Sequence, residues 1–178
     1  MSDGMQWIVR FELPNGGPGP DTVASEDLAD EFDAVVVLLL RDHYCQVSRE
    51  RATAYSDAFE EFEAEDVAVV GALPDTAERA GYWRRRYDLT YPVLADSSEG
   101  PSAGGAEAGA AGTAMTDGTP RFDAFADVEI GAETLPGIGV LDTRSKFPRL
   151  VYTEGGETLQ ECPSPEEALD AALDALGK

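Results

Sequence analysis

The sequence has few cysteines and few cations, and each shortage argues against a class of protein. Cys45 and Cys162 are the only cysteines and form no CxxC pair, which is too few for a secreted disulfide scaffold or a cysteine-bound zinc site. Only 13 Lys and Arg face 35 Asp and Glu, for a formal net charge of -22. Nucleic acid is therefore disfavoured as a partner, because phosphate binding needs clustered cations.

Long apolar runs are also missing. The longest, residues 35–40, falls far short of the roughly 18 apolar residues that a membrane-spanning helix needs. The first residues, MSDGMQWIVRFELP, show neither the basic region nor the apolar region of a signal peptide. We therefore expect a cytoplasmic protein that has no membrane-spanning segment.

The acidic residues are dispersed along the chain and not collected in one partner-binding tail. Dispersed acid with very little lysine resembles the composition of proteins from extreme halophiles, whose cytoplasm is rich in salt. Molar salt shortens the Debye length to about 3 Å, so the repulsion among the acidic side chains is screened. We expect the fold to be stable in molar salt and to loosen in dilute buffer.

The stretch from residue 33 to 51, DAVVVLLLRDHYCQVSRER, is the part of the chain that points to chemistry. Six consecutive apolar residues, half of them β-branched, predict a buried strand over residues 35–40, and the segment after Cys45 has helical spacing. Cys45 is therefore expected in the first turn of a helix, where unpaired backbone N–H groups and the helix dipole favour a thiolate. The stretch predicts a candidate nucleophile.

The remaining strands are predicted from short apolar or alternating segments. One alternating segment precedes the stretch around Cys45, two apolar segments follow it, and a late pair flanks a turn as a β-hairpin. These segments are residues 6–13, 67–72, 91–95, 138–141 and 149–153.

Helices are predicted between these strands. Apolar residues recur at helical intervals from Val47 to Phe62, which predicts one amphipathic helix of about five turns. The expected helix starts are Ser25 as N-cap of a short turn, Asp75 with Glu78 as a capping box, and Ser164 as N-cap with Pro165 at the first position of the last helix.

Strand, helix, strand, helix, strand, loop, hairpin and helix follow one another as in the thioredoxin fold. The strings LLLRDHYCQVSRE, VAVVGALPD, YPVLAD and LPGIGVLD resemble the redoxin family, which includes the peroxiredoxins and the AhpC/TSA alkyl hydroperoxide reductases. The resemblance implies a single thioredoxin-like α/β domain over residues 1–178, with a central mixed β-sheet flanked by helices. A Gly- and Ala-rich segment at about residues 97–120 is expected to form a flexible loop.

The resemblance also implies roles for four residues. Cys45 matches the nucleophilic cysteine of the family, and Tyr44 matches the aromatic residue that commonly precedes it. Ser48 stands where the CxxC motif of thioredoxin-like proteins has its second, resolving cysteine. Pro136 matches the cis-proline that packs beside the nucleophile in such proteins.

The chain departs from the family at two points. The peroxiredoxin pattern PxxxTxxC is not met, because Leu38 and Asp42 hold its proline and threonine positions. Ser48 can offer a hydroxyl to a Cys45 thiolate three residues away, but it cannot resolve a sulfenic acid or a mixed disulfide. Cys162 is the only internal candidate for that step, so the expected reductant is an external thiol or a thioredoxin-type protein.

We therefore interpret the chain as a thiol-dependent redoxin in which Cys45 is a monothiol nucleophile toward a hydroperoxide or a disulfide, with no metal or organic cofactor. Two other functions stay open. One is a non-catalytic module that binds a partner peptide beside Cys45 and Pro136. The other is a redox sensor that forms a homodimer through Cys45 or Cys162. A redoxin with an inert Cys45 is a further alternative.

Overall fold

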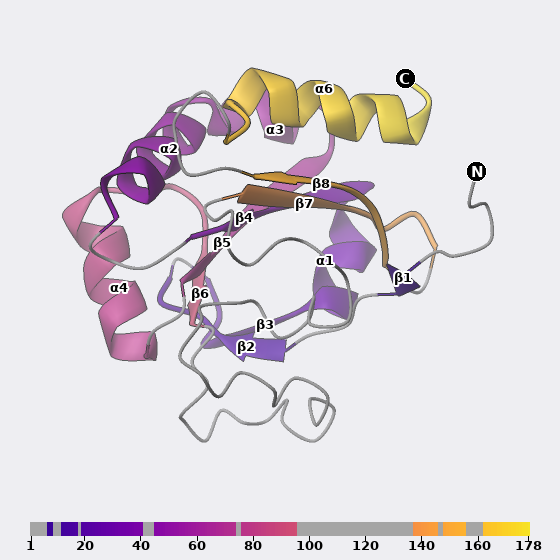
Figure 1. Ribbon diagram of the computed structural model, residues 1–178. Helices are drawn as coiled ribbons and strands as arrows, with labels where there is room; N and C mark the ends of the chain where they lie inside the picture. Colours follow the sequence, from indigo (N-terminus) through magenta and orange to yellow (C-terminus); the bar gives the residue numbers. More distant parts are fainter. Residues whose placement is uncertain are drawn as a thin grey trace.

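The computed structural model describes residues 7–8, 12–17, 19–40, 45–73, 76–95, 137–145, 148–155 and 162–178 (Figure 1). The strands are β1 (Trp7–Ile8), β2 (Glu12–Pro14), β3 (Thr22–Ala24), β4 (Ala34–Leu39), β5 (Val67–Leu73), β6 (Val93–Ala95), β7 (Gly137–Asp142) and β8 (Arg149–Gly155). The helices are α1 (Ser25–Glu31), α2 (Gln46–Asp57), α3 (Phe59–Ala64), α4 (Ala77–Arg86) and α6 (Pro165–Leu176). No helix in these ranges is long and apolar enough to span a membrane.

A six-stranded sheet with the order β1-β8-β7-β4-β5-β6 forms the centre of the molecule. The pairs β4–β5 and β5–β6 are parallel, whereas β4–β7, β7–β8 and β1–β8 are antiparallel. The late hairpin is therefore confirmed as β7 and β8. This mixed sheet with flanking helices is the thioredoxin-like fold that the order of the elements predicted.

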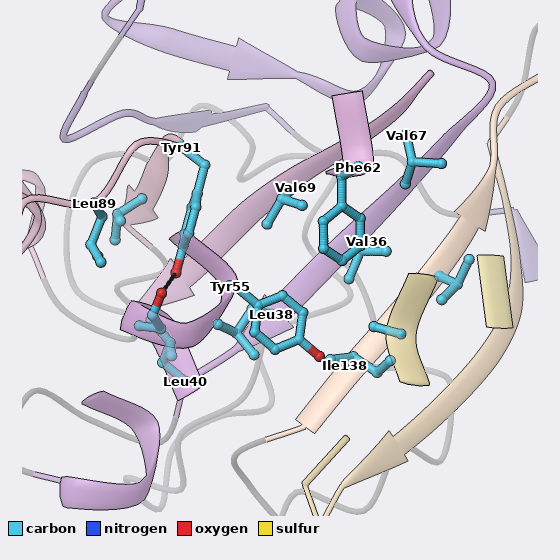
Figure 2. Packing of buried hydrophobic residues seen from close by; sticks show 14 of the residues in the cluster. Val36, Leu38, Leu40, Tyr55, Phe62, Val67, Val69, Leu89, Tyr91 and Ile138 are labelled. Carbon is cyan, nitrogen blue, oxygen red and sulfur yellow. Dashed lines mark hydrogen bonds between the residues drawn. The ribbon is translucent and has the colours of Figure 1, made fainter. Parts of the chain in front are cut away.

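The central strand β4 is buried on both of its faces. Val36 and Leu38 pack with residues of α2, α3, α4 and α6 in the larger core cluster, part of which Figure 2 shows. Val35 and Val37 pack on the other face with residues of α1 and β3. Because successive side chains of a strand point to opposite faces, a strand covered on both sides must be apolar throughout. This double burial explains the unbroken apolar run over residues 35–40.

The last helix begins as predicted, with a complete capping box. The Ser164 hydroxyl accepts the backbone N–H of Glu167 at 3.2 Å, and the Glu167 carboxylate accepts the backbone N–H of Ser164 at 2.9 Å. Pro165 occupies the first turn, where its missing N–H costs no helical hydrogen bond. These contacts are local, which is why the sequence pattern located them.

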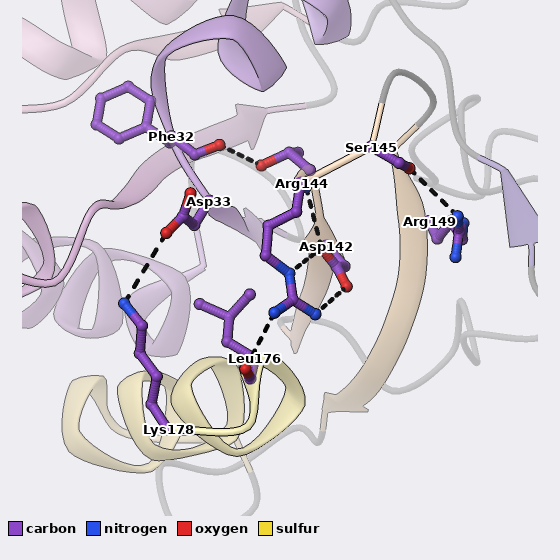
Figure 3. Close-up of polar contacts among 9 residues, drawn as sticks. Phe32, Asp33, Asp142, Arg144, Ser145, Arg149, Leu176 and Lys178 are labelled. Atoms are coloured by element: carbon purple, nitrogen blue, oxygen red, sulfur yellow. Dashed lines mark hydrogen bonds and ion pairs between the residues drawn. The ribbon is translucent and has the colours of Figure 1, made fainter.

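At the C-terminal end of α6, two cations form ion pairs with carboxylates (Figure 3). Arg144 forms an ion pair with Asp142 at 2.9 Å, and its guanidinium also donates a hydrogen bond to the Leu176 carbonyl at 3.0 Å. Lys178 lies 3.9 Å from the Asp33 carboxylate. The Arg144 side chain thus joins the C-terminus of α6 to the end of β7.

The predicted strand over residues 6–13 is strand at the described residues 7–8 and 12–13, but these two pieces belong to different sheets. β1 pairs with β8 in the large sheet, whereas β2 pairs with β3 after a turn of which residues 15–17 and 19–21 are described. Asn15 closes this turn by donating to the Pro20 carbonyl at 2.8 Å and accepting the Gly17 N–H at 2.8 Å. Alternation in a sequence indicates a strand but does not identify its partner.

The prediction of one long helix from Val47 to Phe62 is also wrong. Ala58 leaves the helical conformation, with φ −98° and ψ 8°, and separates α2 from α3. The apolar face continues across this break, since the rings of Tyr55 and Phe62 stack with centroids 5.9 Å apart. Helical periodicity reports a shared face, so it does not detect a single residue that breaks the helix and preserves the face.

Two helix starts also differ from the predicted ones. Ser25 is the first residue of α1, and its N-cap is Ala24, whose side chain makes no capping hydrogen bond. The N-cap of α4 is Thr76, whose hydroxyl accepts the backbone N–H of Arg79 at 3.2 Å. Asp75, the predicted cap, lies outside the described residues. Adjacent Asp and Thr residues are both good caps, so the pattern alone does not separate them.

Candidate functional site: Cys45 at the start of α2

Cys45 stands between the central sheet and α2. Leu40 donates its backbone N–H to the Ala72 carbonyl at 3.0 Å, so pairing with β5 extends to the carboxyl end of β4. The next helix, α2, begins at Gln46, and Cys45 is its N-cap with the extended angles φ −70° and ψ 120°. The prediction that a helix starts at Cys45 is confirmed.

The sulfur of Cys45 lies over the first turn of α2. It accepts a hydrogen bond from the backbone N–H of Ser48, with a nitrogen–sulfur distance of 3.4 Å. The Cys45 carbonyl accepts the N–H of Arg49 at 3.1 Å, and the Cys45 residue is half-buried. The thiol therefore takes the place of the capping oxygen of Ser or Asp, where orphan N–H groups and the dipole favour negative charge.

The first turn of α2 contains no acidic residue. By contrast, α1, α3, α4 and α6 each have at least one Asp or Glu in that turn. An acidic side chain stabilises a helix N-terminus, but at this place it would repel a thiolate. Among the described helices, only α2 has a thiol and no carboxylate at its N-terminal, positive end.

Ser48 contacts Cys45 through its backbone, a contact that sequence reasoning missed because it considered only the hydroxyl. The Ser48 residue is fully buried and lies on the same face of α2 as Ala52 and Tyr55, which are also fully buried. The residue at the fourth position of the CxxS motif therefore packs against the core. Any residue except proline provides the N–H at this position, which explains why no sequence signal marked it.

Cys162 is close to α2 but is enclosed by the protein. Its relative exposure is 0%, and its carbonyl accepts a hydrogen bond from the Arg51 guanidinium at 3.0 Å. The hydroxyl of Tyr55 donates to the next carbonyl, that of Pro163, at 2.8 Å. The chain before α6 is thus attached to α2 about two to three turns beyond Cys45.

Burial raises the pKa of the Cys162 thiol to about 12, because a thiolate there would lose its hydration. The positive charge and hydrogen bond of Arg51 oppose this rise, and negative charge on Cys45 adds to it. The two cysteines therefore lie within electrostatic range of each other, although both are free thiols. At neutral pH Cys162 is a protonated, inaccessible thiol.

Two of the predicted site residues, Tyr44 and Pro136, lie outside the described residues, as does the predicted loop at residues 97–120. Cys45 and Ser48 are the predicted site residues that the structure describes, and it brings them into contact. Within the described ranges, no group of three His, Cys, Asp or Glu side chains is placed to hold a metal ion.

Comparison with known proteins shows which family has this arrangement. The sequence matches the AhpC/TSA family over residues 6–103, more than half of the chain. The chain belongs to the AhpC/TSA family. The matched part of this AhpC/TSA protein contains β4, Cys45 and α2, whereas Cys162 and α6 lie beyond it. No curated protein sequence matches it.

Solved structures share the fold of this AhpC/TSA protein at low sequence identity. Peroxidoxin BcpB from Mycobacterium tuberculosis is 19% identical with a TM-score of 0.61, and the similarity covers 96% of this chain and 94% of that one. A yeast mitochondrial 1-Cys peroxiredoxin is 16% identical, with a TM-score of 0.64 and coverage of 97% and 77%. A secreted thiol-disulfide isomerase from Corynebacterium glutamicum is 17% identical, with a TM-score of 0.64 and coverage of 96% and 86%. The likeness in fold therefore extends well beyond residue 103.

Proposed function

We propose that this AhpC/TSA protein is a monothiol redoxin in which Cys45 is the nucleophile and an external thiol completes the cycle. The observation that carries the proposal is the placement of the Cys45 sulfur on the Ser48 N–H, in a first helical turn that lacks acidic residues. The enclosed Cys162 supports the monothiol assignment, because a protonated and inaccessible thiol is a poor attacking group. Tyr44 and Pro136 are proposed to flank Cys45, on the resemblance to the family.

The first step consumes a hydroperoxide. The Cys45 thiolate attacks one peroxide oxygen, an S–O bond forms, and the O–O bond breaks. The leaving alkoxide takes a proton and departs as an alcohol. The sulfur is oxidised by two electrons to a sulfenic acid, and the peroxide is reduced by two. With a disulfide as substrate, the same thiolate forms a mixed disulfide and expels a thiolate.

The second step needs a thiol from outside the chain, because Ser48 holds the place of a resolving cysteine. One external thiol attacks the sulfenic sulfur, an S–S bond forms, and water leaves. A second thiol attacks the external sulfur of that mixed disulfide, which releases a small disulfide and restores Cys45. The yeast 1-Cys peroxiredoxin of similar fold has a thiol resolving mechanism via glutathione/thioredoxin systems, which supports a reductant of this class.

The test is the oxidation rate of Cys45 by hydrogen peroxide in molar KCl, followed by mass spectrometry of the Cys45 peptide. We expect the wild-type protein to react much faster than a free cysteine and Cys45→Ser to consume peroxide only at the background rate. Cys162→Ser is the matched control and is expected to keep the wild-type rate. A Cys45 that reacts no faster than a free thiol would falsify the enzymatic proposal and favour the non-catalytic binding module.

A further inference from the structure

Two arginines converge on Tyr87 beside the first turn of α2. The Arg49 guanidinium lies 5.8 Å from the centre of the Tyr87 ring, and that of Arg86 lies 5.6 Å from it. Tyr87 follows α4 directly and packs edge-on against the buried Trp83, with ring centroids 5.4 Å apart. The three residues Arg49, Arg86 and Tyr87, here named the cationic cluster, are therefore held together by packing between two helices.

The cationic cluster is adjacent to the candidate nucleophile. The backbone N–H of Arg49 donates to the Cys45 carbonyl at 3.1 Å, which places Arg49 in the same helical turn as the Cys45 sulfur. Residues four apart at this spacing have Cβ atoms about 5–6 Å apart. A small molecule whose sulfur reaches Cys45 therefore lies beside the turn that carries Arg49, and Arg49 and Arg86 meet at the Tyr87 ring.

The positive charge of the cluster is not neutralised by the described part of the chain. Of the described residues, none places a carboxylate in an ion pair with Arg49 or Arg86, although the whole chain carries 35 Asp and Glu. Glu50, next to Arg49, instead accepts a hydrogen bond from Gln46 at 2.9 Å. The guanidinium group of Arg86, together with that of Arg49, lowers the pKa of Tyr87, as expected where two cations meet one phenol. An anion would stabilise this arrangement.

We propose that the cationic cluster binds the carboxylate end of a small anionic thiol whose sulfur reduces oxidised Cys45. Guanidinium groups present paired N–H donors that match a carboxylate, and Tyr87 adds an aromatic face. An acidic protein is a poorer occupant, because its approach is opposed by a chain of net charge -22, whereas a small molecule has little charge to repel. The proposal deepens the function proposed above and rests on it, since it names the class of the reductant.

Two molecules of the thiol reduce the Cys45 sulfenic acid by two electrons, in two steps. The thiolate of the small molecule attacks the sulfenic sulfur of Cys45, an S–S bond forms, and the S–O bond breaks with loss of water. A second molecule of the thiol attacks the small-molecule sulfur, so that the S–S bond to Cys45 breaks and Cys45 returns as a thiolate. Two thiols are oxidised to one disulfide, and the sulfenic acid is reduced by the same two electrons.

The test measures the second exchange alone. Cys45 is first converted to its mixed disulfide with 2-mercaptoethanol, which is neutral. The rate at which free Cys45 is regenerated from this mixed disulfide is then measured with two thiols. Mercaptosuccinate carries two carboxylates, and cysteamine carries an ammonium group. Both rate constants are divided by the fraction of each thiol that is ionised at the working pH. The experiment uses the lowest KCl concentration at which circular dichroism shows the folded protein. The readout is the ratio of the mercaptosuccinate rate to the cysteamine rate.

We expect Arg49→Gln and Arg86→Gln each to lower this ratio about threefold, and the double variant about tenfold, as for partly exposed ion pairs. Lys178→Gln is the matched control, because it removes one positive charge at the end of α6, far from the start of α2 (Figure 1). The control should keep the wild-type ratio. Succinate should slow mercaptosuccinate and leave cysteamine unaffected.

A ratio that is unchanged in both arginine variants, or that changes equally in Lys178→Gln, would overturn the proposal. Arg86 is exposed on the last turn of α4, so its variant tests the cluster even if Arg49→Gln disturbs α2. Because the experiment starts from a preformed mixed disulfide, its outcome does not depend on peroxide. A failure of Cys45 with peroxide is therefore distinguishable from a failure of the cationic cluster.

Discussion

Cys45 and Cys162 contact the same helix, α2, in opposite environments. Cys45 is half-buried at the helix N-terminus, and its sulfur accepts a backbone N–H. Cys162 has 0% exposure, and burial raises its pKa to about 12 despite the nearby Arg51. The thiol at the start of α2 is thus suited to nucleophilic attack, whereas the thiol packed against the side of α2 behaves like an apolar side chain.

The charges around the two ends of the molecule differ in a similar way. At the C-terminal end of α6, Arg144 and Lys178 are paired with carboxylates. Beside Cys45, Arg49 and Arg86 meet at Tyr87 without a carboxylate from the described residues. Paired cations stabilise the fold, whereas cations that converge without a counter-charge are suited to an incoming anion.

The largest expected effect is a difference in alkylation between the two cysteines. A thiol with a pKa of about 12 has about one thiolate in 10⁴ molecules at about pH 8, so Cys162 should react with iodoacetamide on the order of 10³-fold more slowly than an ordinary thiol. Cys45 should be labelled readily. Pulsed labelling followed by peptide mass spectrometry gives both rates, and unfolded protein in guanidinium chloride is the control, in which both cysteines should react alike.

The dependence on pH has a definite sign. Because the folded pKa of Cys162 is raised, its protonated form stabilises the fold fully below the unfolded value of about 8.5. This stabilisation is lost as the pH rises toward about 12. Protection of Cys162 should therefore persist near neutral pH and weaken above about pH 9. Rapid labelling of Cys162 at neutral pH in the folded protein would contradict its enclosed position.

Lowering the salt concentration is expected to reduce the contrast between the two cysteines in a graded way. A chain of net charge -22 repels itself when the Debye length grows from about 3 Å in molar salt to about 10 Å at 0.1 M. We predict that the fold loosens in dilute buffer and that Cys162 then becomes reactive, while Cys45 changes little. The measurement is iodoacetamide labelling beside thermal melts over a series of KCl concentrations. A melting temperature that is independent of salt would contradict this prediction.

The smallest expected effect is that of Ser48→Ala on the reactivity of Cys45. The backbone N–H of Ser48 donates to the sulfur and is kept in the variant, so the alkylation rate of Cys45 should change less than about threefold. The loss of the buried hydroxyl should cost about 1 kcal/mol of unfolding free energy, measured by denaturant titration. A tenfold fall in the rate would instead assign the capping role to the hydroxyl.

Elements with local signals were predictable. Residues 35–39 of the apolar run lie in β4 and Ser164 caps α6, as predicted, because an apolar run and a capping motif are patterns of adjacent residues. The break at Ala58 and the separate partners of β1 and β2 were not predictable. β1 pairs with the distant β8 and β2 with the nearby β3. A periodic pattern contains no information about the partner of a strand or about a single residue that leaves the helix.

In the candidate site, too, some features were predictable from the sequence and others were not. The sequence by itself determined that Cys45 follows a buried strand and starts a helix, since apolar runs and helical spacing are properties of adjacent residues. Only the tertiary structure decided that Cys162 is enclosed against Arg51 and that Arg49 meets Tyr87. These contacts join α2 to segments that precede α6 and follow α4. Their existence depends on how the helices pack on the sheet, and packing is decided by the whole chain and not by any single stretch.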